Sequence, residues 1–285
     1  MTTKPLVKWV GGKSNIVSSI IEKFPSKINN YHEPFIGSGS VLFAFLDAVE
    51  NNTIDFHGFI YISDKNPLLI EMYRSIKDNP DELIQYFTTL QDEYMNTKTK
   101  KEYYYKQRNR FNGLTEEEMS SSQKSALFIF INKTCFRGLY RLNSKNEFNV
   151  PFGNYSNPKF PKNEEIQKIS DKLQNAYIYN CDFSEAFTRI KENDVIYIDP
   201  PYVPLNRTSF TAYTNDGFNE EKHKNLFENC HSMNTIATLI ISNSDTEWIR
   251  NNFHNYIIYT IDVKRAIHSK NPGSSVNEVI ITNNI

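Results

Sequence analysis

The stretch that decides the fold is Asp194-Val195-Ile196-Tyr197-Ile198, which is followed directly by Asp199-Pro200-Pro201-Tyr202. A short apolar run that ends in turn-forming residues is typical of a strand buried on both faces of a parallel sheet. Its carboxyl end then presents a carboxylate, two proline rings and an aromatic face at the edge where open α/β sheets bind ligands. The alternative is an ordinary strand-ending turn, because aspartate and proline both favour turns.

The residues from Asp199 to Tyr202 have the groups needed to activate an exocyclic amine. The lone pair of such a nitrogen is delocalised into its ring until acceptors hold both of its hydrogens. The Asp199 carboxylate and the Pro200 carbonyl would be those acceptors, and Tyr202 would offer a face on which a planar base can stack. Each proline fixes φ near about −65° and so restricts the carbonyl. We therefore take Asp199, Pro200 and Tyr202 as candidate catalytic residues.

A second pattern near the N-terminus indicates a nucleoside pocket. The segment Tyr31-His32-Glu33-Pro34-Phe35-Ile36-Gly37-Ser38-Gly39-Ser40 reads as a strand that leads into a Gly-x-Gly turn, and Asp64 ends the next expected strand. Such a turn lets the backbone approach a ligand, and the acidic residue can accept hydrogen bonds from ribose hydroxyls. Taken alone, the two glycines are more often a structural turn and Asp64 a solvated strand end.

Five motifs together resemble the Dam-type (alpha-class) site-specific DNA adenine-N6 methyltransferase family. The resemblance runs from Lys8 to Thr282, and the motifs stand in the family's order: Lys8–Lys13, Glu33–Gly39, Phe148–Gly153, Asp199–Tyr202 and Ser209–Tyr213. It implies an α/β fold: a Rossmann-like methyltransferase sheet with an inserted, mainly helical DNA-recognition domain that carries a β-hairpin. The implied cofactor is S-adenosyl-L-methionine, with S-adenosyl-L-homocysteine as the product and no metal.

The resemblance also assigns cofactor-binding residues. It implies that Trp9 and Lys13 cover the cofactor, that Asp64 binds its ribose and that Asp182 lies near its adenine. Some relatives lack an aspartate at the position of Asp182, so a solvated strand end is the alternative there. The full set of expected cofactor-binding residues is Trp9, Lys13, Phe35, Gly37, Gly39, Asp64, Asp182 and Asp199.

DNA contacts are implied for a third set of residues. Phe136 occupies the place of an aromatic wedge between base pairs, and Arg141 and Lys8 match residues that read guanine. Arg137 departs from a close relative, which has asparagine there. Phe136 in the hairpin core and Arg141 as a phosphate clamp are the alternatives. The full set of expected DNA-binding residues is Lys8, Phe136, Arg137, Leu139, Arg141 and Pro151.

The predicted function is methyl transfer to N6 of a flipped-out adenine in double-stranded DNA, within the sequence GATC. Two other classes stay open: a catalytically inactive DNA-binding module with the same fold, and a methyltransferase acting on RNA or on a protein glutamine. Relatives of the latter class typically carry asparagine in place of Asp199 and lack the insertion.

Composition restricts these choices only weakly. The chain has 285 residues and a net charge of −1, so a basic surface must be regional. Between Lys98 and Lys145 there are eleven Lys or Arg against four Glu and no Asp, with aromatic residues interleaved, which is typical of a DNA-binding surface but also of a solvated helix face. The three cysteines form no C-x-x-C pair, the histidines show no ligand spacing, and no apolar run is long enough to span a membrane.

From these patterns we expect a cytoplasmic, DNA-associated enzyme that is a monomer or weak dimer, does not bind membranes and has a cognate restriction endonuclease as an expected partner. The expected division places the catalytic, S-adenosylmethionine-binding domain at 1–67 and 165–285. The inserted target-recognition domain covers 68–164, with its hairpin at 135–152 and a turn at 143–146. Helices are expected at 13–24 and 41–50 and a short apolar helix at 126–132, and strands are expected at 59–63, 177–179, 195–198, 238–242, 256–261 and 278–282.

Overall fold

The computed structural model describes residues 2–113, 119–204, 218–264 and 275–284. The chain divides into two compact units. Unit 1 comprises Met1–Gly12, Gly37–Phe43 and Asn66–Ile178, and unit 2 comprises Lys13–Ile36, Ala44–Lys65 and Tyr179–Ile285. Unit 1 contains the whole range 68–164. The domain boundaries expected from the sequence stay a prediction.

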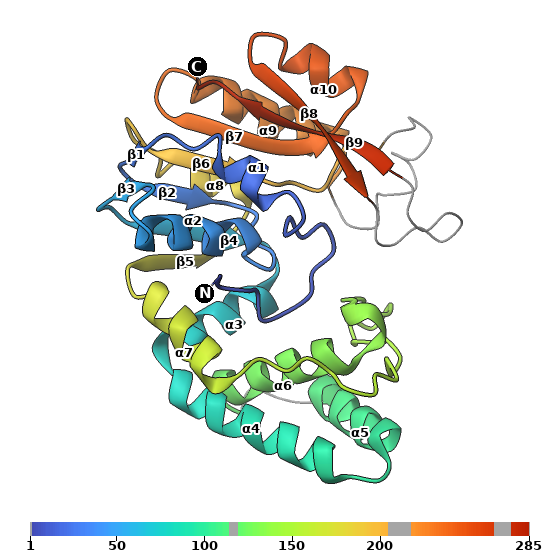
Figure 1. Cartoon of the computed structure of the whole chain (residues 1–285). Helices are drawn as coiled ribbons and strands as arrows, with labels where there is room; N and C mark the ends of the chain where they lie inside the picture. Colours follow the sequence, from blue (N-terminus) through green and yellow to red (C-terminus); the bar gives the residue numbers. More distant parts are fainter. Residues whose placement is uncertain (1, 114–118, 205–217, 265–274, 285) are drawn as a thin grey trace. The chain divides into compact units, whose positions relative to one another are not determined.

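A seven-stranded sheet has the order β5-β4-β2-β6-β7-β9-β8 (Figure 1), and all of it except residues 176–178 of β5 belongs to unit 2. Its strands are β2 (Tyr31–Glu33), β4 (Ile60–Asp64), β5 (Ala176–Asn180), β6 (Val195–Ile198), β7 (Thr238–Ser244), β8 (Ile257–Lys264) and β9 (Ser275–Thr282). Strand β2 pairs in parallel with β4 and β6, and β6 pairs in parallel with β7. Strand β9 runs antiparallel to both β7 and β8. The predicted fold class, a methyltransferase sheet of the Rossmann-like type, is confirmed.

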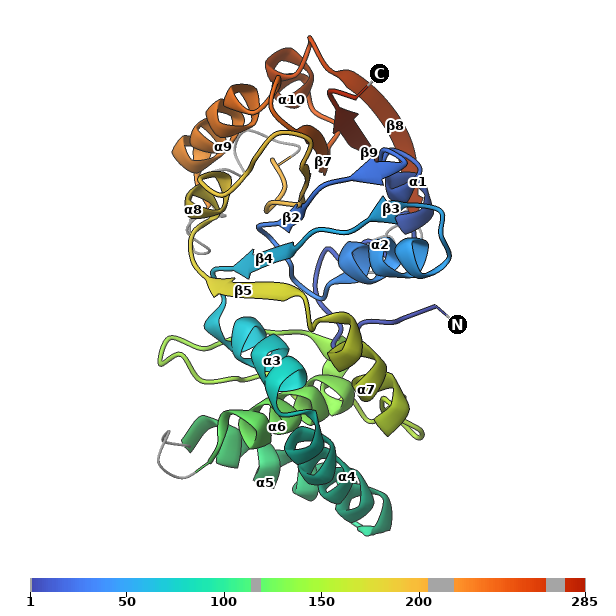
Figure 2. The same ribbon diagram turned by 90° about the vertical axis from the view of Figure 1, so that its left-hand side faces the viewer.

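The helices of unit 2 cover both faces of this sheet. Figure 2 shows α8 (Phe183–Phe187) and α9 (Glu220–Ser232) on one face and α1 (Val17–Ile21) on the other. The remaining elements are α2 (Ser40–Glu50), which begins in unit 1, α10 (Glu247–Asn252), and a separate parallel pair of β1 (Lys27–Ile28) with β3 (Asp55–Phe56). All four residues of β6 are buried, which explains why its sequence is a continuous apolar run.

Unit 1 is a helical assembly. It contains α3 (Pro67–Asp78), α4 (Pro80–Asn96), α5 (Lys100–Gly113), α6 (Ser121–Thr134), the 3₁₀ turn η1 (Phe136–Gly138) and α7 (Asn163–Lys172). Helix α6 is buried almost throughout and packs against α3, α4 and α5. Asn66 and Ser120 cap the N-termini of α3 and α6 with their side-chain oxygens.

Two helices differ from the sequence prediction. The helix expected at 13–24 is reduced to α1, because Lys13 to Ile16 form a turn closed by the Ile16 N–H donating to the Lys13 carbonyl at 2.9 Å. That turn directs the buried Lys13 side chain toward Asp199. Helix α6 is longer than the apolar run 126–132, because the Ser120 cap starts it at Ser121.

The segment 135–152 contains two antiparallel bridges, Cys135 with Phe152 and Leu142 with Phe148. Between these bridges the described backbone forms η1, so the pairing is interrupted. The expected turn at 143–146 is present, with the Asn143 side-chain oxygen accepting from the backbone N–H groups of Lys145 and Glu147.

Candidate active site

Three carboxylates stand at the carboxyl ends of neighbouring parallel strands in unit 2. Glu33 ends β2, Asp64 ends β4 and Asp199 follows β6. Strand β2 lies between β4 and β6, so the chain order reverses across it, and such a switch point is where α/β sheets bind ligands. Glu33 is buried and accepts a hydrogen bond from the Tyr31 hydroxyl at 2.7 Å.

Asp199 forms an ion pair with Lys13. The Lys13 ammonium lies 2.8 Å from the Asp199 carboxylate, and only 6% of the Lys13 side chain is exposed. Burial raises the pKa of Asp199 above its ordinary value, the neighbouring Lys13 opposes that rise, and the negative charge of Glu278 adds to it. The lysine charge favours the ionised carboxylate, which is the form that accepts hydrogen bonds.

Tyr202 is fixed at both ends of its side chain. Its hydroxyl donates to the Glu278 carboxylate at 2.8 Å, and the Lys13 ammonium lies 4.7 Å from its ring centroid. Burial, reinforced by Asp199, raises the pKa of Tyr202 well above its ordinary value, so the hydroxyl stays a donor at neutral pH. The sequence reasoning did not include Glu278, because nothing local to that residue indicates that β9 brings it to Tyr202.

The other expected cofactor residues of unit 2 have defined surroundings. The Asn180 side chain donates to the backbone carbonyls of Asp64 and Lys65, which fixes the turn after β4. Asp182 caps α8 by accepting from the Ser184 N–H, and Lys222 lies 3.8 Å from its carboxylate. Phe35 stacks on Phe183 with 5.5 Å between ring centroids.

The glycine turn belongs to unit 1, where it meets Trp9. Gly37 and Gly39 have φ of +47° and +76°, and a Cβ on Gly39 would lie 2.7 Å from the Tyr73 hydroxyl. The same hydroxyl donates to the Gly37 carbonyl at 3.1 Å. The Trp9 indole lies against Gly37 and stacks on Tyr140 at 5.0 Å. Only glycine fits this close approach of backbone and side chains.

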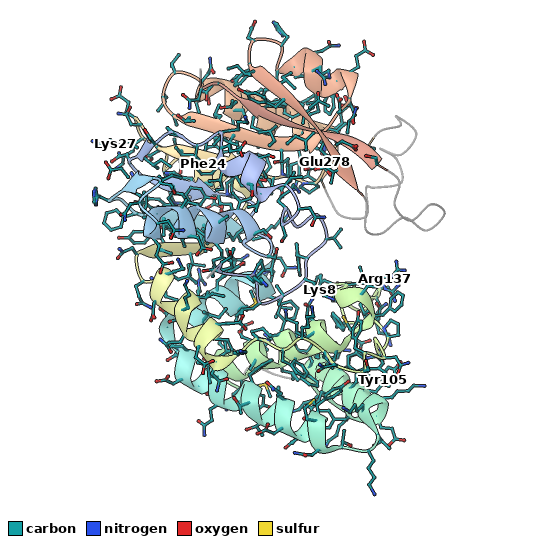
Figure 3. The ribbon with its side chains drawn as sticks, in the orientation of Figure 1. Lys8, Phe24, Lys27, Tyr105, Arg137 and Glu278 are labelled. Carbon is teal, nitrogen blue, oxygen red and sulfur yellow. The ribbon has the colours of Figure 1, made fainter. Side chains whose placement is uncertain are left out.

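Asn132 joins the segments that carry the expected DNA-binding residues. Its side chain is fully buried at the end of α6; it accepts from the Lys8 N–H at 2.8 Å and donates to the carbonyls of Lys8 and Gly138. A Cβ on Gly138 would lie 2.5 Å from the Lys8 side chain. Lys8 is thereby held beside η1, and Figure 3 labels Lys8 and Arg137 in this part of unit 1. The sequence offered no signal for Asn132, because an asparagine near a helix end is usually exposed.

Several side chains in and near η1 are exposed to solvent. Phe136 is 44% exposed although it is a large apolar residue, and the Arg137 guanidinium lies 5.2 Å from its ring. The Phe136 N–H donates to the Pro151 carbonyl at 2.8 Å, so Pro151 lies at the base of the turn. Arg141 is exposed and oriented by donating to the Asn149 side-chain oxygen at 2.7 Å. Leu139 follows η1 directly in the chain.

The basic segment, from Lys98 to Lys145, has some side chains at the surface and others buried in the core of unit 1. Lys98, Lys100 and Lys101 line a hollow at the start of α5, together with Phe152 and Tyr155. Tyr104, one of the aromatic residues interleaved among the basic ones, is fully buried and donates to the Val150 carbonyl. Its ring lies 5.5 Å from that of Phe152, measured between centroids. The expected motif Ser209–Tyr213 lies outside the described residues.

Neither a metal centre nor a membrane span is found in the described part of the chain. Among residues 2–113, 119–204, 218–264 and 275–284, no three His, Cys, Asp or Glu side chains gather as metal ligands would. No helix within the same ranges combines the length and the apolar character that crossing a membrane requires.

The seven-stranded, mostly parallel sheet agrees with the fold of S-adenosylmethionine-dependent methyltransferases, and its switch point is where such folds bind ligands. The family described as D12 class N6 adenine-specific DNA methyltransferase matches residues 9–267. The chain belongs to this family, and it is therefore an N6-adenine DNA methyltransferase.

Relatives of known name agree with this assignment. The chain is 37% identical to the Type II methyltransferase M.MjaIII of Methanocaldococcus jannaschii, over 95% of this chain and 94% of that protein. It is 35% identical to the DNA adenine methylase of Haemophilus influenzae, over 96% of this chain and 90% of the relative. The DNA adenine methylase of Escherichia coli K12 is 33% identical, over 93% of this chain and 90% of the relative.

Proposed function

We propose that this enzyme transfers the methyl group of S-adenosylmethionine to N6 of an adenine that has rotated out of double-stranded DNA, within the sequence GATC. The observation that carries the proposal is the group formed by Asp199, Lys13 and Tyr202 directly after β6. Family membership favours DNA over RNA or a protein glutamine as the substrate, and the aspartate at position 199 agrees with that choice.

The residues present fit the cofactor. In unit 2, Lys13, Phe35, Asp64, Asp182 and Asp199 would hold it, with Asp64 accepting from its ribose. The other expected cofactor residues are Trp9, Gly37 and Gly39; both glycines adopt positive φ, and Trp9 lies against Gly37. When bound, S-adenosylmethionine supplies an electrophilic methyl group on a sulfonium with a good leaving group.

The chain's own residues then orient the target nitrogen. Asp199 and the Pro200 carbonyl accept the two amine hydrogens, which lets the nitrogen lone pair localise. Lys13 keeps Asp199 in its ionised, accepting form against the effect of burial. Tyr202 stacks on the adenine and helps to offset the few kcal/mol that unpairing the base costs. Catalysis is mainly orientation and preorganised electrostatics.

We assign specificity to Lys8 and to residues of the segment 136–151. Arg141 would donate two hydrogen bonds to O6 and N7 of one guanine in the major groove, while Lys8 would contact the other guanine. Leu139, Arg137 and Pro151 would contact neighbouring base pairs, and the exposed Phe136 ring would enter the stack and stabilise the rotated state.

The test is to map methylated adenines in DNA of random sequence. We expect modification at GATC in the wild type. Arg141→Ala should cost about 1–3 kcal/mol at one guanine only and relax the preference there. Lys101→Ala is the control, because loss of a phosphate-binding lysine should weaken all sites alike and flatten the salt dependence. Methylation mostly outside GATC, or an Arg141→Ala variant with lower activity and unchanged preference, would contradict the specificity.

A biological role is suggested by two relatives named Type II methyltransferases. On that basis we propose a cognate restriction endonuclease, acting on the same DNA sequence, as a partner of this enzyme in the cell.

A further inference from the structure

The loop from Asp199 to Tyr202 has few backbone groups that can donate hydrogen bonds to neighbouring segments. Pro200 and Pro201 have no backbone N–H, so neither residue can donate a hydrogen bond to a neighbouring segment. Proline restricts φ, but the position of the whole loop relative to the sheet still requires anchors. On its N-terminal side the loop continues from β6, and Asp199 is tied to Lys13.

The first anchor on the C-terminal side comes from β7. The Val203 N–H donates to the Asn243 side-chain oxygen at 3.1 Å, and the Ser244 hydroxyl donates to the Val203 carbonyl at 2.6 Å. Both backbone groups of Val203 are therefore bound by consecutive side chains at the end of one strand. Asn243 is fully buried, and its side-chain NH₂ has no partner among the described residues. A buried donor without a partner lowers stability.

The second anchor comes from β9. Strands β7 and β9 pair so that Ser244 lies opposite Glu278. The Glu278 carboxylate accepts from the Tyr202 hydroxyl at 2.8 Å. One cross-strand position therefore supplies the bonds to both Tyr202 and Val203, and Figure 3 labels Glu278 on its strand.

We propose that Glu278, Asn243 and Ser244 are positioning residues for methyl transfer, with Glu278 acting through the Tyr202 hydroxyl. The bonds to Tyr202 and Val203 would fix the Tyr202 ring that stacks on the adenine. Through Pro201 they would also fix the Pro200 carbonyl, which accepts a hydrogen bond from the adenine amine. This inference rests on the proposed role of Asp199, Pro200 and Tyr202. It adds three residues from the paired strands β7 and β9.

The test compares Glu278→Leu with Glu278→Gln in steady-state methylation of DNA. Leucine removes the acceptor, and we expect kcat to fall about 10- to 100-fold while KM for S-adenosylmethionine changes less than about threefold, since misplacement of reacting groups by about 1 Å costs up to 100-fold. Glutamine keeps an acceptor oxygen and should restore kcat to within about threefold. Glu228→Leu, at an exposed position on α9, is the matched control and should leave kcat unchanged.

A double-mutant cycle with Tyr202→Phe separates positioning from general stability. The phenylalanine variant keeps the ring and loses the hydroxyl, so its kcat should fall as in Glu278→Leu, and the double variant should be no worse than either single one. Ser244→Ala should lower kcat as well while thermal unfolding remains cooperative. Multiplicative losses in the cycle, or full kcat in Glu278→Leu, would overturn the inference. A wild type without methylation activity would instead overturn the proposed function.

Discussion

At the scale of single residues, the site depends on the charge state of Asp199. Burial raises its pKa, Lys13 lowers it, and Glu278 raises it further. Tyr197 and Tyr202 also face this carboxylate, but both phenols have a raised pKa and are neutral at ordinary pH. The acceptor form of Asp199 is therefore present above its pKa and is lost as the pH falls through it.

Replacing Lys13 should make this dependence visible. Lys13→Met removes the charge that favours ionised Asp199, so the pKa of Asp199 should rise and the acid limb of the kcat profile should move to higher pH. The measurement is kcat against pH at saturating S-adenosylmethionine and DNA. Lys23→Met is the control, because Lys23 lies over the Tyr259 ring instead and should leave the limb in place. An acid limb that stays fixed in Lys13→Met would mean that Lys13 does not set the charge of Asp199.

The residues that could be predicted from sequence were those within a local motif. Asp199 to Tyr202 follows an apolar run, and Gly37 and Gly39 follow a strand, so each pattern indicates its own position at a strand end. Glu278, Asn243 and Asn132 had no such signal. Their partners lie 76, 40 and 124 residues away in the chain, and the contacts depend on strand register and helix packing.

At the scale of elements, apolar runs predicted the strands well. The segment 195–198 is β6 as expected, because a strand buried on both faces must be apolar throughout. The end of β7 was expected at residue 242, but the strand extends to Ser244 because Asn243 and Ser244 pair with Val279 and Glu278 of β9. A hydrophobic pattern cannot predict that a polar residue is buried through a hydrogen bond to a distant segment.

The junction of α6 with η1 offers a test at this scale. Asn132→Ala leaves the Lys8 N–H and the Lys8 and Gly138 carbonyls without their buried partner, so the free energy of unfolding should fall by about 1–3 kcal/mol. DNA affinity should fall with it, because Lys8 and η1 lose their common support. Urea unfolding and DNA titration measure the two effects.

The control for that variant is Asn229→Ala, whose side chain bonds Asn225 within the same exposed face of α9. Asn229→Ala should change the free energy of unfolding and the DNA affinity only slightly. Wild-type stability together with wild-type DNA affinity in Asn132→Ala would show that Asn132 does not support the DNA-binding segment.

At the scale of the whole molecule, the chain combines a nearly neutral net charge with a regional concentration of Lys and Arg. Unit 1 holds the basic segment and the glycine turn, and unit 2 holds the carboxylates at the strand ends. Burial and the neighbouring Lys8 lower the pKa of Lys133 to about 8. Total charge therefore gives no indication of DNA binding, and the role of the basic segment between Lys98 and Lys145 in DNA binding stays a prediction.

The most direct test of the central claim is a single-turnover reaction of wild type and Asp199→Ala with S-adenosylmethionine and DNA, followed by digestion and mass spectrometry of the nucleosides. We predict N6-methyladenine from the wild type and a rate at least about a hundredfold lower from Asp199→Ala, with DNA binding retained, because the variant loses an amine acceptor. Asp262→Ala, which removes an exposed aspartate of β8, should react as the wild type does. Near-wild-type formation of N6-methyladenine by Asp199→Ala would contradict the account.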